Sequence, residues 1–370
     1  MPFSIFAVLI VSLAITLLII PLLIKLFSRK SIVDRKNRRK IHQREVPTMG
    51  GTGFFLAFIL TILLLGTFEQ LAPHRVELLT MSVMFVVGLR DDLIELKPIS
   101  KLIAQLVPAL LLIYLTSLVF TSLNGFLGIY TIPYWAGLSL SLITIVGLTN
   151  SFNLIDGLDG LAGSLALLAS VVFGIWFYVQ GIEYYSFIAF AFAGSLAGFI
   201  YYNWQPAKIF MGDTGALVIG FLLSILAIKF IDINARLSEG TQFKFNSGIA
   251  FAISVLIIPV FDTIRIIVVR LLSGKPLFSA DKNHTHHLLL RLGLSHSRST
   301  LLLLAINLGF IGFIFFLDFL GDNILIPILA IMALTFSLVL KVLIDRKISM
   351  QRYNGKSTWL EVIKSERKAS

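Results

Sequence analysis

The sequence predicts an all-α, polytopic membrane protein with about eleven transmembrane helices, its N-terminus outside and its C-terminus in the cytoplasm. Three observations support this prediction. Hydrophobic residues make up 57% of the 370 residues and charged residues only 14%, a balance far from that of soluble domains. The apolar residues gather in runs close to the roughly 20 residues that cross a bilayer as a helix. Lysine and arginine gather in particular connections between these runs, which indicates orientation.

Eleven apolar runs follow one another along the chain. They cover residues 3–27, 49–68, 76–89, 99–119, 134–149, 161–180, 185–202, 214–232, 247–272, 300–319 and 324–343. The first run is too long for a cleaved signal peptide and has no basic segment before it, so we expect a permanent helix. The third and fifth runs are short, which leaves the count open by one. We expect residues 1–344 to form a single integral-membrane catalytic domain and residues 345–370 a basic cytoplasmic tail.

The basic residues give the expected orientation, because short loops rich in Lys and Arg stay in the cytoplasm. The connection after the first run, SRKSIVDRKNRRKIHQREV, and the tail are both strongly basic. An odd number of spans places both on the same side of the membrane. The chain contains no cysteine, which excludes disulfides, thiolate catalysis and Cys-ligated zinc.

Every polar cluster that needs an explanation falls in a connection that this topology places in the cytoplasm. These connections read RKIHQREVPTMGG, RDDLIELKPISK, NSFNLIDGLDGLAGS, NWQPAKIFMGDTG and SGKPLFSADKNHTHHLLLRLGLSHSRS. The pattern predicts a single composite site at the cytoplasmic membrane surface. A transporter, the main rival, would bind its substrate near the bilayer midplane, often between repeated halves, and the sequence shows no internal repeat. A lipid-binding scaffold, the second rival, leaves the aspartates of these clusters unexplained.

Asp91 and Asp92 stand side by side after the run at 76–89. Two adjacent carboxylates at a membrane edge lose hydration and repel each other unless a cation compensates them. Mg²⁺ suits this place, because it takes oxygen ligands and shares its coordination with waters and substrate phosphates. A solvated helix terminus is the alternative. Lys97 and Lys101 follow in the same connection, where they can pair with the aspartates or hold an anion.

The stretch NSFNLIDGLDGLAGS at 150–164 repeats a polar side chain every three residues, in Asn153, Asp156 and Asp159. On a helix this spacing places them on roughly one face. The glycines among them let the backbone approach a ligand. We predict a polar pocket wall here. Helix capping is the alternative, and it accounts for only one or two of these residues.

In the segment FMGDTGAL, Asp213 and Thr214 stand between glycines just before the next apolar stretch. Asp213 as an N-cap accounts for this arrangement. The alternative is a metal ligand beside a helix N-terminus whose amides face phosphate oxygens. Lys208 is close enough in sequence to add a positive charge.

Three histidines, His284, His286 and His287, stand within four residues. Closed zinc sites usually draw on Cys or on more widely spaced ligands. We therefore interpret this cluster, with the basic residues around it, as a clamp for a diphosphate or a proton relay. We interpret His296 as part of a solvated face.

One pair of charges lies inside an apolar run, with Asp262 and Arg265 three residues apart. Charged residues within a membrane span often have a function. The two charges of this pair can neutralise each other, so we expect a structural ion pair. We expect Arg270 to extend to the cytoplasmic interface.

Dispersed carboxylates for Mg²⁺, together with basic and histidine side chains for anions, indicate phosphoryl chemistry on a membrane-dissolved partner. The soluble partner would carry a diphosphate and the lipid partner a phosphate. Such transfer depends mainly on alignment of the reactants and on charge neutralisation.

The chain resembles the polyprenyl-phosphate N-acetylhexosamine-1-phosphate transferases, a family that includes the MraY and WecA/TagO branches. The resemblance runs from about residue 38 to residue 290 and includes four ordered motifs. They are DDLIELKPISK, NSFNLIDGLDGLA, FMGDTGAL and HTHH, which look like the family's Asp-Asp, Asn-x-x-Asn-x-x-Asp-Gly-x-Asp-Gly, Gly-Asp-Thr-Gly and histidine motifs.

The resemblance implies transfer of a sugar 1-phosphate from a UDP-sugar to undecaprenyl phosphate, with release of UMP, at the inner (plasma) membrane of a bacterium. It implies Mg²⁺, or Mn²⁺ in its place, with Asp213 as the principal ligand and Asn153 as a second. It also implies a homodimer and no nucleic acid partner.

The resemblance assigns further roles. Asp91, Asp92 and Lys101 would lie near the lipid phosphate. Asp156 and Asp159 would line the nucleotide and sugar pocket, and His284, His286 and His287 would face the diphosphate. The other expected substrate-binding residues are Asn150, Asn153, Lys40, His42, Thr48 and Lys208.

Finer features point to the donor. The threonine between the first two histidines and the segment NWQPAKIFMGD resemble the WecA/TagO branch, which uses UDP-GlcNAc. VPTMGG resembles the MraY branch, which uses UDP-MurNAc-pentapeptide. We expect UDP-GlcNAc, with the MraY donor as the alternative. We favour direct attack by the lipid phosphate over a two-step route through an aspartyl adduct.

Overall fold

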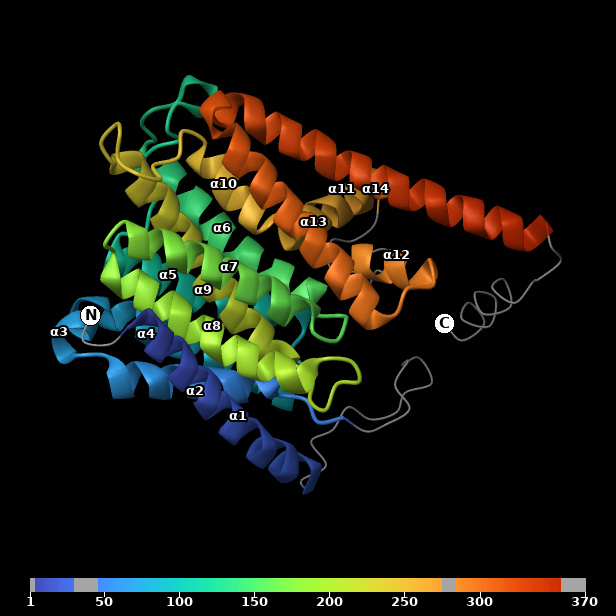
Figure 1. Cartoon of the computed structure of the whole chain (residues 1–370), viewed down its shortest axis with the longest axis horizontal. Coiled ribbons are helices and arrows are strands. Elements are labelled where there is room, and N and C mark those ends of the chain that lie inside the picture. The colour runs from blue at the N-terminus through green and yellow to red at the C-terminus, as the bar shows by residue number, and fades with distance from the viewer. Residues whose placement is uncertain (1–3, 30–45, 275–283, 354–370) are drawn as a thin grey trace.

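The structure is a computed structural model that describes residues 4–29, 46–274 and 284–353, the side chains of residues 29 and 350–353 excepted. The described residues form helices, as predicted (Figure 1). The main helices are α1 (Ile5–Arg29), α2 (Gly50–Leu65), α4 (Arg75–Leu93), α5 (Pro98–Thr116), α6 (Tyr134–Ile155), α7 (Leu161–Val179), α8 (Glu183–Asn203), α9 (Gly212–Arg236), α10 (Gly248–Val255), α11 (Ile257–Leu272), α13 (His296–Leu317) and α14 (Asp322–Tyr353). Shorter elements are α3 (Phe68–Leu71), α12 (Thr285–Arg291) and the 3-10 turns Ala72–His74, Phe126–Gly128 and Asp318–Leu320.

Within the described residues, nine helical segments are long and apolar enough to cross a membrane, or ten if α10 and α11 count as one bent span. The predicted multi-pass architecture is therefore confirmed. In place of the predicted run at 49–68, α2 is an apolar helix of only 16 residues. The exact count of eleven and the orientation of the chain stay predictions.

At the centre of the bundle lies α9, which packs against α2, α4, α6, α7 and α10. Its residues from Thr214 to Ile228 are all buried, as expected for a helix that is apolar on every side. Glycine allows close approach: a Cβ on Gly220 would lie 2.4 Å from Cα of Thr149 in α6. This packing fixes the start of α9, which carries the Gly-Asp-Thr-Gly motif.

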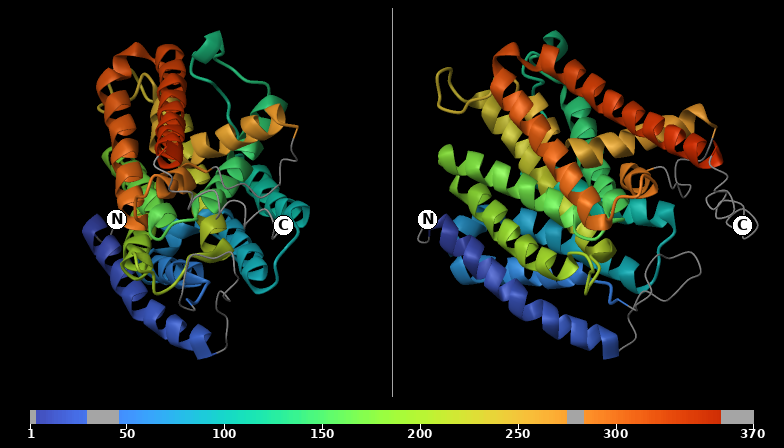
Figure 2. Two further views of the ribbon diagram at one scale, coloured as in Figure 1. Left: turned by 90° about the vertical axis from the view of Figure 1, so that its right-hand side faces the viewer. Right: turned by 45° about the vertical axis from the view of Figure 1, so that its right-hand side comes forward.

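The predicted helix at 247–272 is broken. It bends by 85° between α10 and α11, at Leu256. Asn307 of α13, which is fully buried, donates to the carbonyl of Val255 at 3.1 Å. Such a contact satisfies a backbone group that the break releases inside the membrane. The left view of Figure 2 shows the yellow-orange α11 running outward from the bundle.

The last helix, α14, continues through residue 344, where we placed the end of the membrane domain, to Tyr353. Figure 1 shows it along one edge of the molecule, extending beyond the other helices. Nζ of Lys347 donates to the carbonyl of Arg291 at 3.1 Å. The start of the predicted tail therefore contacts the end of α12, and the rest of that tail lies outside the described residues.

Candidate functional site

The polar clusters meet at one end of the bundle, where α4, α6 and α8 end and α5, α7 and α9 begin. The segment before α2 lies alongside the segment before α9. Gly50 N donates to the carbonyl of Phe210 at 2.8 Å, and Phe210 N donates to the carbonyl of Pro47 at 2.9 Å. This pairing brings Thr48 to the Gly-Asp-Thr-Gly motif, so the described end of the connection before α2 joins the site.

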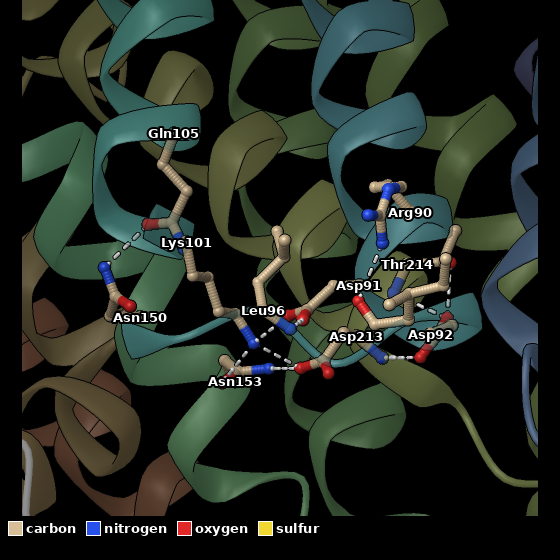
Figure 3. A network of polar contacts seen from close by, with 11 residues as sticks. Arg90, Asp91, Asp92, Leu96, Lys101, Gln105, Asn150, Asn153, Asp213 and Thr214 are labelled. Carbon is tan, nitrogen blue, oxygen red and sulfur yellow. Dashed lines mark hydrogen bonds and ion pairs between the residues drawn. The ribbon is translucent and has the colours of Figure 1, made fainter. Parts of the chain in front are cut away.

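Asp92, at the end of α4, caps the N-terminus of α9. Its Oδ1 accepts from the amide of Asp213 at 2.7 Å and its Oδ2 from the amide of Thr214 at 3.0 Å. The hydroxyl of Thr214 also donates to Oδ2 (Figure 3). A negative charge is stabilising at this end of a helix. The N-cap residue of α9 is Met211, and Asp213 lies in the first turn of the helix, so the N-cap interpretation of Asp213 was wrong.

Two glycine contacts make this arrangement possible. Gly212 has a φ of +76°, and a Cβ there would lie 2.7 Å from Oδ2 of Asp92. A Cβ on Gly51 of α2 would lie 2.1 Å from the amide nitrogen of Gly215. The glycines of VPTMGG and of GDTG therefore serve the close packing of α2 and α4 on the first turn of α9.

Lys101, near the start of α5, points its ammonium group into a ring of three oxygens. Nζ lies 2.8 Å from Oδ2 of Asp91, 2.5 Å from Oδ1 of Asp213 and 3.2 Å from Oδ1 of Asn153 (Figure 3). Asn153 also donates to Oδ1 of Asp213. Oδ1 of Asp91 accepts from the amide of Leu96 at 2.7 Å. Three helices, α4, α6 and α9, thus each contribute an oxygen to one positive charge.

The predicted Mg²⁺ ligands Asp213 and Asn153 are therefore adjacent, and their oxygens already converge on a cation. This donor set fits a hard divalent ion. Within the described ranges, no three His, Asp or Glu side chains form a metal-binding group. Mg²⁺ commonly binds through one or two carboxylates and completes its shell with waters and substrate phosphates, so the residues present fit a shared site better than a closed one.

Asp156 follows α6 and faces the other carboxylates. Burial, and then the negative charges of Asp213, Asp92 and Asp159, raise the pKa of Asp156 to about 8, although one edge of the side chain still reaches the cavity. Asp159 is only 6% exposed, and its Oδ2 accepts from the amide of Ala207 at 3.3 Å. Asp156 is thus accessible to a ligand, whereas Asp159 is largely held within the protein.

Asp262 of α11 organises the start of the histidine cluster. Its Oδ2 lies 2.7 Å from Nδ1 of His284, and its Oδ1 accepts from the amide and the hydroxyl of Thr285 at 2.8 and 2.6 Å. Nη2 of Arg265 lies 3.0 Å from the same Oδ1, which confirms the expected ion pair. The pair also has a role that its sequence spacing did not indicate: it orients His284 and fixes the first turn of α12.

His286 is 1% exposed and packs on Gly157, where a Cβ would lie 2.4 Å from Nε2. Burial, and then the charge of His287, lower the pKa of His286 to about 3. His286 is therefore a neutral imidazole near neutral pH and adds no positive charge to the predicted diphosphate clamp. The rings of His286 and His287 lie 4.2 Å apart between centroids.

Two cavities meet at these residues. The larger, of about 690 Å³, lies among α5, α6, α11 and α12 and is lined on its polar side by Asp91, Lys101, Asn150, His284, His286 and His287. Its apolar lining includes Leu102, Val146 and Ile267. The smaller, of about 470 Å³, is lined by Thr48, Asp92, Asp159, Asn203 and the segment 210–213. Asn153, Asp156, Gly157 and Asp213 line both cavities and form the wall between them.

Some predicted residues lie elsewhere. Lys208 is exposed and lines neither of these cavities. Lys40 and His42 fall outside the described residues. Two interpretations were wrong: Arg270 is 5% exposed and lines the larger cavity instead of extending to the interface, and His296 is 8% exposed instead of lying on a solvated face. Both side chains were misplaced because their surroundings come from distant parts of the chain.

Two buried amide side chains that connect the loops of the site, Gln105 and Asn203, were not predicted. Gln105 of α5, fully buried, accepts from Nδ2 of Asn150 at 2.8 Å. Asn203 accepts from the amide of Gly160 at 2.9 Å and donates to the carbonyl of Ile209 at 2.8 Å. Asn203 is the first residue of the segment NWQPAKIFMGD, which already stood out by its resemblance to the family. Gln105 lies within an apolar run, and no neighbouring motif distinguishes it.

Comparisons with known proteins show the family of this chain. Residues 75–231 match the sequence profile of glycosyl transferase family 4. A probable undecaprenyl-phosphate N-acetylglucosaminyl 1-phosphate transferase of Bacillus subtilis (strain 168) is 32% identical over 83% of this chain and 81% of the relative. A decaprenyl-phosphate N-acetylglucosaminephosphotransferase of Mycobacterium tuberculosis is 30% identical over 75% and 74%. An undecaprenyl-phosphate alpha-N-acetylglucosaminyl 1-phosphate transferase of Yersinia pestis is 29% identical over 76% of each chain.

Proposed function

This chain belongs to glycosyl transferase family 4, and from that premise we propose that it transfers N-acetylglucosamine 1-phosphate from UDP-GlcNAc to undecaprenyl phosphate. UMP is the second product, and the lipid-linked sugar initiates a cell-envelope glycan. The observation that carries the proposal is the convergence of Asp91, Asn153 and Asp213 on one cation at the wall between two cavities. Such a site can hold a diphosphate between a soluble and a lipid substrate.

The lipid phosphate would enter the larger cavity. Its walls combine Lys101 with apolar side chains of α5, α6 and α11, and α11 also presents exposed Ile264 and Val268 to its surroundings. An isoprenoid chain is apolar and its head is an anion, so this combination matches both parts. The nucleotide sugar would use the smaller, more polar cavity, with Thr48 and Asp156 in its wall.

The reaction is an in-line displacement at phosphorus. An oxygen of the lipid phosphate attacks the β-phosphorus of UDP-GlcNAc, a new P–O bond forms, and the bond from the β-phosphorus to the bridging oxygen breaks. UMP leaves with the electron pair of that bond. Because a phosphate monoester is already an anion near neutral pH, the protein need not generate the nucleophile, and alignment and charge neutralisation suffice.

Asp213 and Asn153, with Asp91 beside them, would hold Mg²⁺, or Mn²⁺ in its place, which neutralises charge on the diphosphate when bound. Asp92 keeps Asp213 in position through the first turn of α9. His284, oriented by Asp262 through Nδ1, lines the larger cavity, where its ring would lie against the diphosphate. Asp156 contributes to the wall on which the diphosphate would lie.

We place this site on the cytoplasmic face of a bacterial inner membrane, where nucleotide sugars are available, and we retain the homodimer as part of the proposal. The basic connections of the sequence support the orientation. The clustering of the site at one end of the bundle speaks against the transporter, which would bind its substrate near the midplane.

A panel of donors tests the proposal. Purified protein in detergent is incubated with undecaprenyl phosphate, MgCl₂ and either UDP-GlcNAc or UDP-MurNAc-pentapeptide, and lipid-linked product is measured by mass spectrometry. Product from UDP-GlcNAc alone is expected. Product from the pentapeptide donor alone would support the MraY alternative, and absence of both products would refute the transferase assignment. Stoichiometric release of UMP without lipid would contradict direct attack and favour the aspartyl route.

A further inference from the structure

We propose that the ammonium group of Lys101 occupies the position of the divalent cation in the metal-free protein, and that metal binding displaces it into the larger cavity. There it would meet the phosphate of the lipid substrate. Only the identity of that phosphate rests on the proposed function. Lys101 would thus be a positioning residue whose place reports whether the metal is bound.

The contacts of Nζ resemble the shell of a bound cation. Its three acceptors are Asp91 at 2.8 Å, Asp213 at 2.5 Å and Asn153 at 3.2 Å. All are oxygens, and they come from α4, α9 and α6, so no single helix dictates the arrangement. The side chain of Asp91 is only 2% exposed. A buried carboxylate of this kind needs a nearby positive charge, and in the described part of the site Lys101 supplies it.

The ammonium group and a metal ion cannot share these oxygens. Mg²⁺ binds its ligands at about 2.0 to 2.1 Å, and a lysine at hydrogen-bonding distance from the same Oδ1 of Asp213 would lie against the ion. Two positive charges so close in a partly buried site repel each other strongly. Lysine carries its charge on a flexible four-carbon chain, and Lys101 already lines the larger cavity. Its ammonium group can therefore move into that cavity when a metal ion binds.

Because the ammonium group of Lys101 and the metal ion compete for the same oxygens, removing Lys101 should strengthen metal binding. Lys101→Met and Lys101→Gln remove the competing charge and leave the three oxygens in place. In thermal unfolding of the purified full-length protein in detergent, both variants should melt lower than wild type without metal. Their half-maximal stabilisation should occur at MgCl₂ concentrations lower by about tenfold, equivalent to about 1.4 kcal/mol.

Lys97→Met is the matched control, because Lys97 precedes the same helix, is exposed and does not line the cavity. Its MgCl₂ midpoint should equal that of wild type. The proposal is overturned if the two Lys101 variants require the same or more MgCl₂ than wild type, or if MgCl₂ stabilises none of these proteins.

A second measurement uses the wild-type protein and does not depend on the folding of a variant. Reductive methylation followed by mass spectrometry should label Lys101 several-fold faster with MgCl₂ than with EDTA, because the displaced amine faces the cavity. The labelling of Lys97 should not change. Equal labelling of Lys101 in both conditions contradicts the displacement. Neither experiment uses a substrate, so failure of the transfer reaction alone would refute only the proposed function.

Discussion

The carboxylate of Asp92 accepts a hydrogen bond from the amide of Asp213 at 2.7 Å, across 121 residues of sequence. The first turn of α9 is therefore held by a side chain from α4, and the orientation of the Asp213 carboxylate depends on that contact. Asp92, which resembles a catalytic residue in sequence, therefore has a structural role as the cap of α9.

Replacing Asp92 distinguishes a role in capping α9 from a direct role in the transfer reaction. Asp92→Ala removes all three accepted hydrogen bonds and should lower the free energy of unfolding by about 2 kcal/mol, with weaker Mg²⁺ stabilisation. Asp92→Asn keeps one acceptor oxygen and should lose less of both. Thermal unfolding with and without MgCl₂ measures the two effects. Unchanged stability in Asp92→Ala, with activity lost equally in both variants, would contradict the capping role.

The contact between Asp262 and His284 gives a second prediction. In Asp262→Asn, an amide that faces Nδ1 can donate where the carboxylate accepted, so the imidazole loses its fixed orientation. Turnover should fall roughly tenfold or more, the usual cost of losing an outer-shell partner of a site histidine. Asp232→Asn is the control, since Asp232 pairs with Arg236 at the opposite end of α9, and its turnover should stay near wild type. Equal turnover of the two variants would argue against a role for Asp262.

Gly157 is predicted to be intolerant of any side chain. A Cβ there would lie 2.4 Å from Nε2 of His286, a ring that is nearly fully buried. Gly157→Ala should lower the free energy of unfolding by about 1 to 3 kcal/mol and reduce transfer. Gly309→Ala in α13 is the matched control, because nothing lies within 4 Å of a Cβ at that position. Gly309→Ala should be neutral or slightly stabilising, and a similarly mild Gly157→Ala would show that the contact with His286 is unimportant.

Asp156 links stability to pH. Its pKa in the folded protein is raised to about 8, above its ordinary value of about 4 in an unfolded chain. Its contribution to stability is therefore fully present below the unfolded value and is lost as the pH rises through about 8. In EDTA, the melting temperature of Asp156→Asn relative to wild type should rise between about pH 5 and about pH 8 and then level off. With MgCl₂ and both substrates, the variant should lose transfer activity. A melting difference that stays constant with pH would contradict the raised pKa.

Much of the site was predictable because polar residues are conspicuous in apolar surroundings. Polar side chains at a membrane edge need polar or charged partners. The alternating topology placed three of them, Asp91, Asn153 and Asp213, at one end of the bundle. The partners themselves were not predictable. The spacing of Asp262 and Arg265 indicated a self-contained ion pair, whereas His284 and Thr285 come from another element.

The fold departs from the prediction where packing overrides local pattern. The apolar run at 247–272 contains Pro259, which lacks the amide hydrogen that would bond the carbonyl of Val255 and so marks a break. The sequence does not show that Asn307 of a later helix satisfies that carbonyl. His296 is buried for a related reason: its Nδ1 lies 3.6 Å from Oδ1 of Asp159, which belongs to a loop more than a hundred residues earlier. A single sequence does not contain such long-range pairings explicitly.

Whether the site holds a metal-bound diphosphate is tested by comparing the two products with and without the metal. Purified protein, UDP-GlcNAc and undecaprenyl phosphate are incubated with MgCl₂, with EDTA, or with EDTA followed by excess MgCl₂. We expect UMP and lipid-linked N-acetylglucosamine phosphate in equal amounts with MgCl₂, neither product in EDTA, and recovery of both when the metal is restored. Equal transfer in EDTA would contradict a site in which Asp213 and Asn153 hold a metal-bound diphosphate.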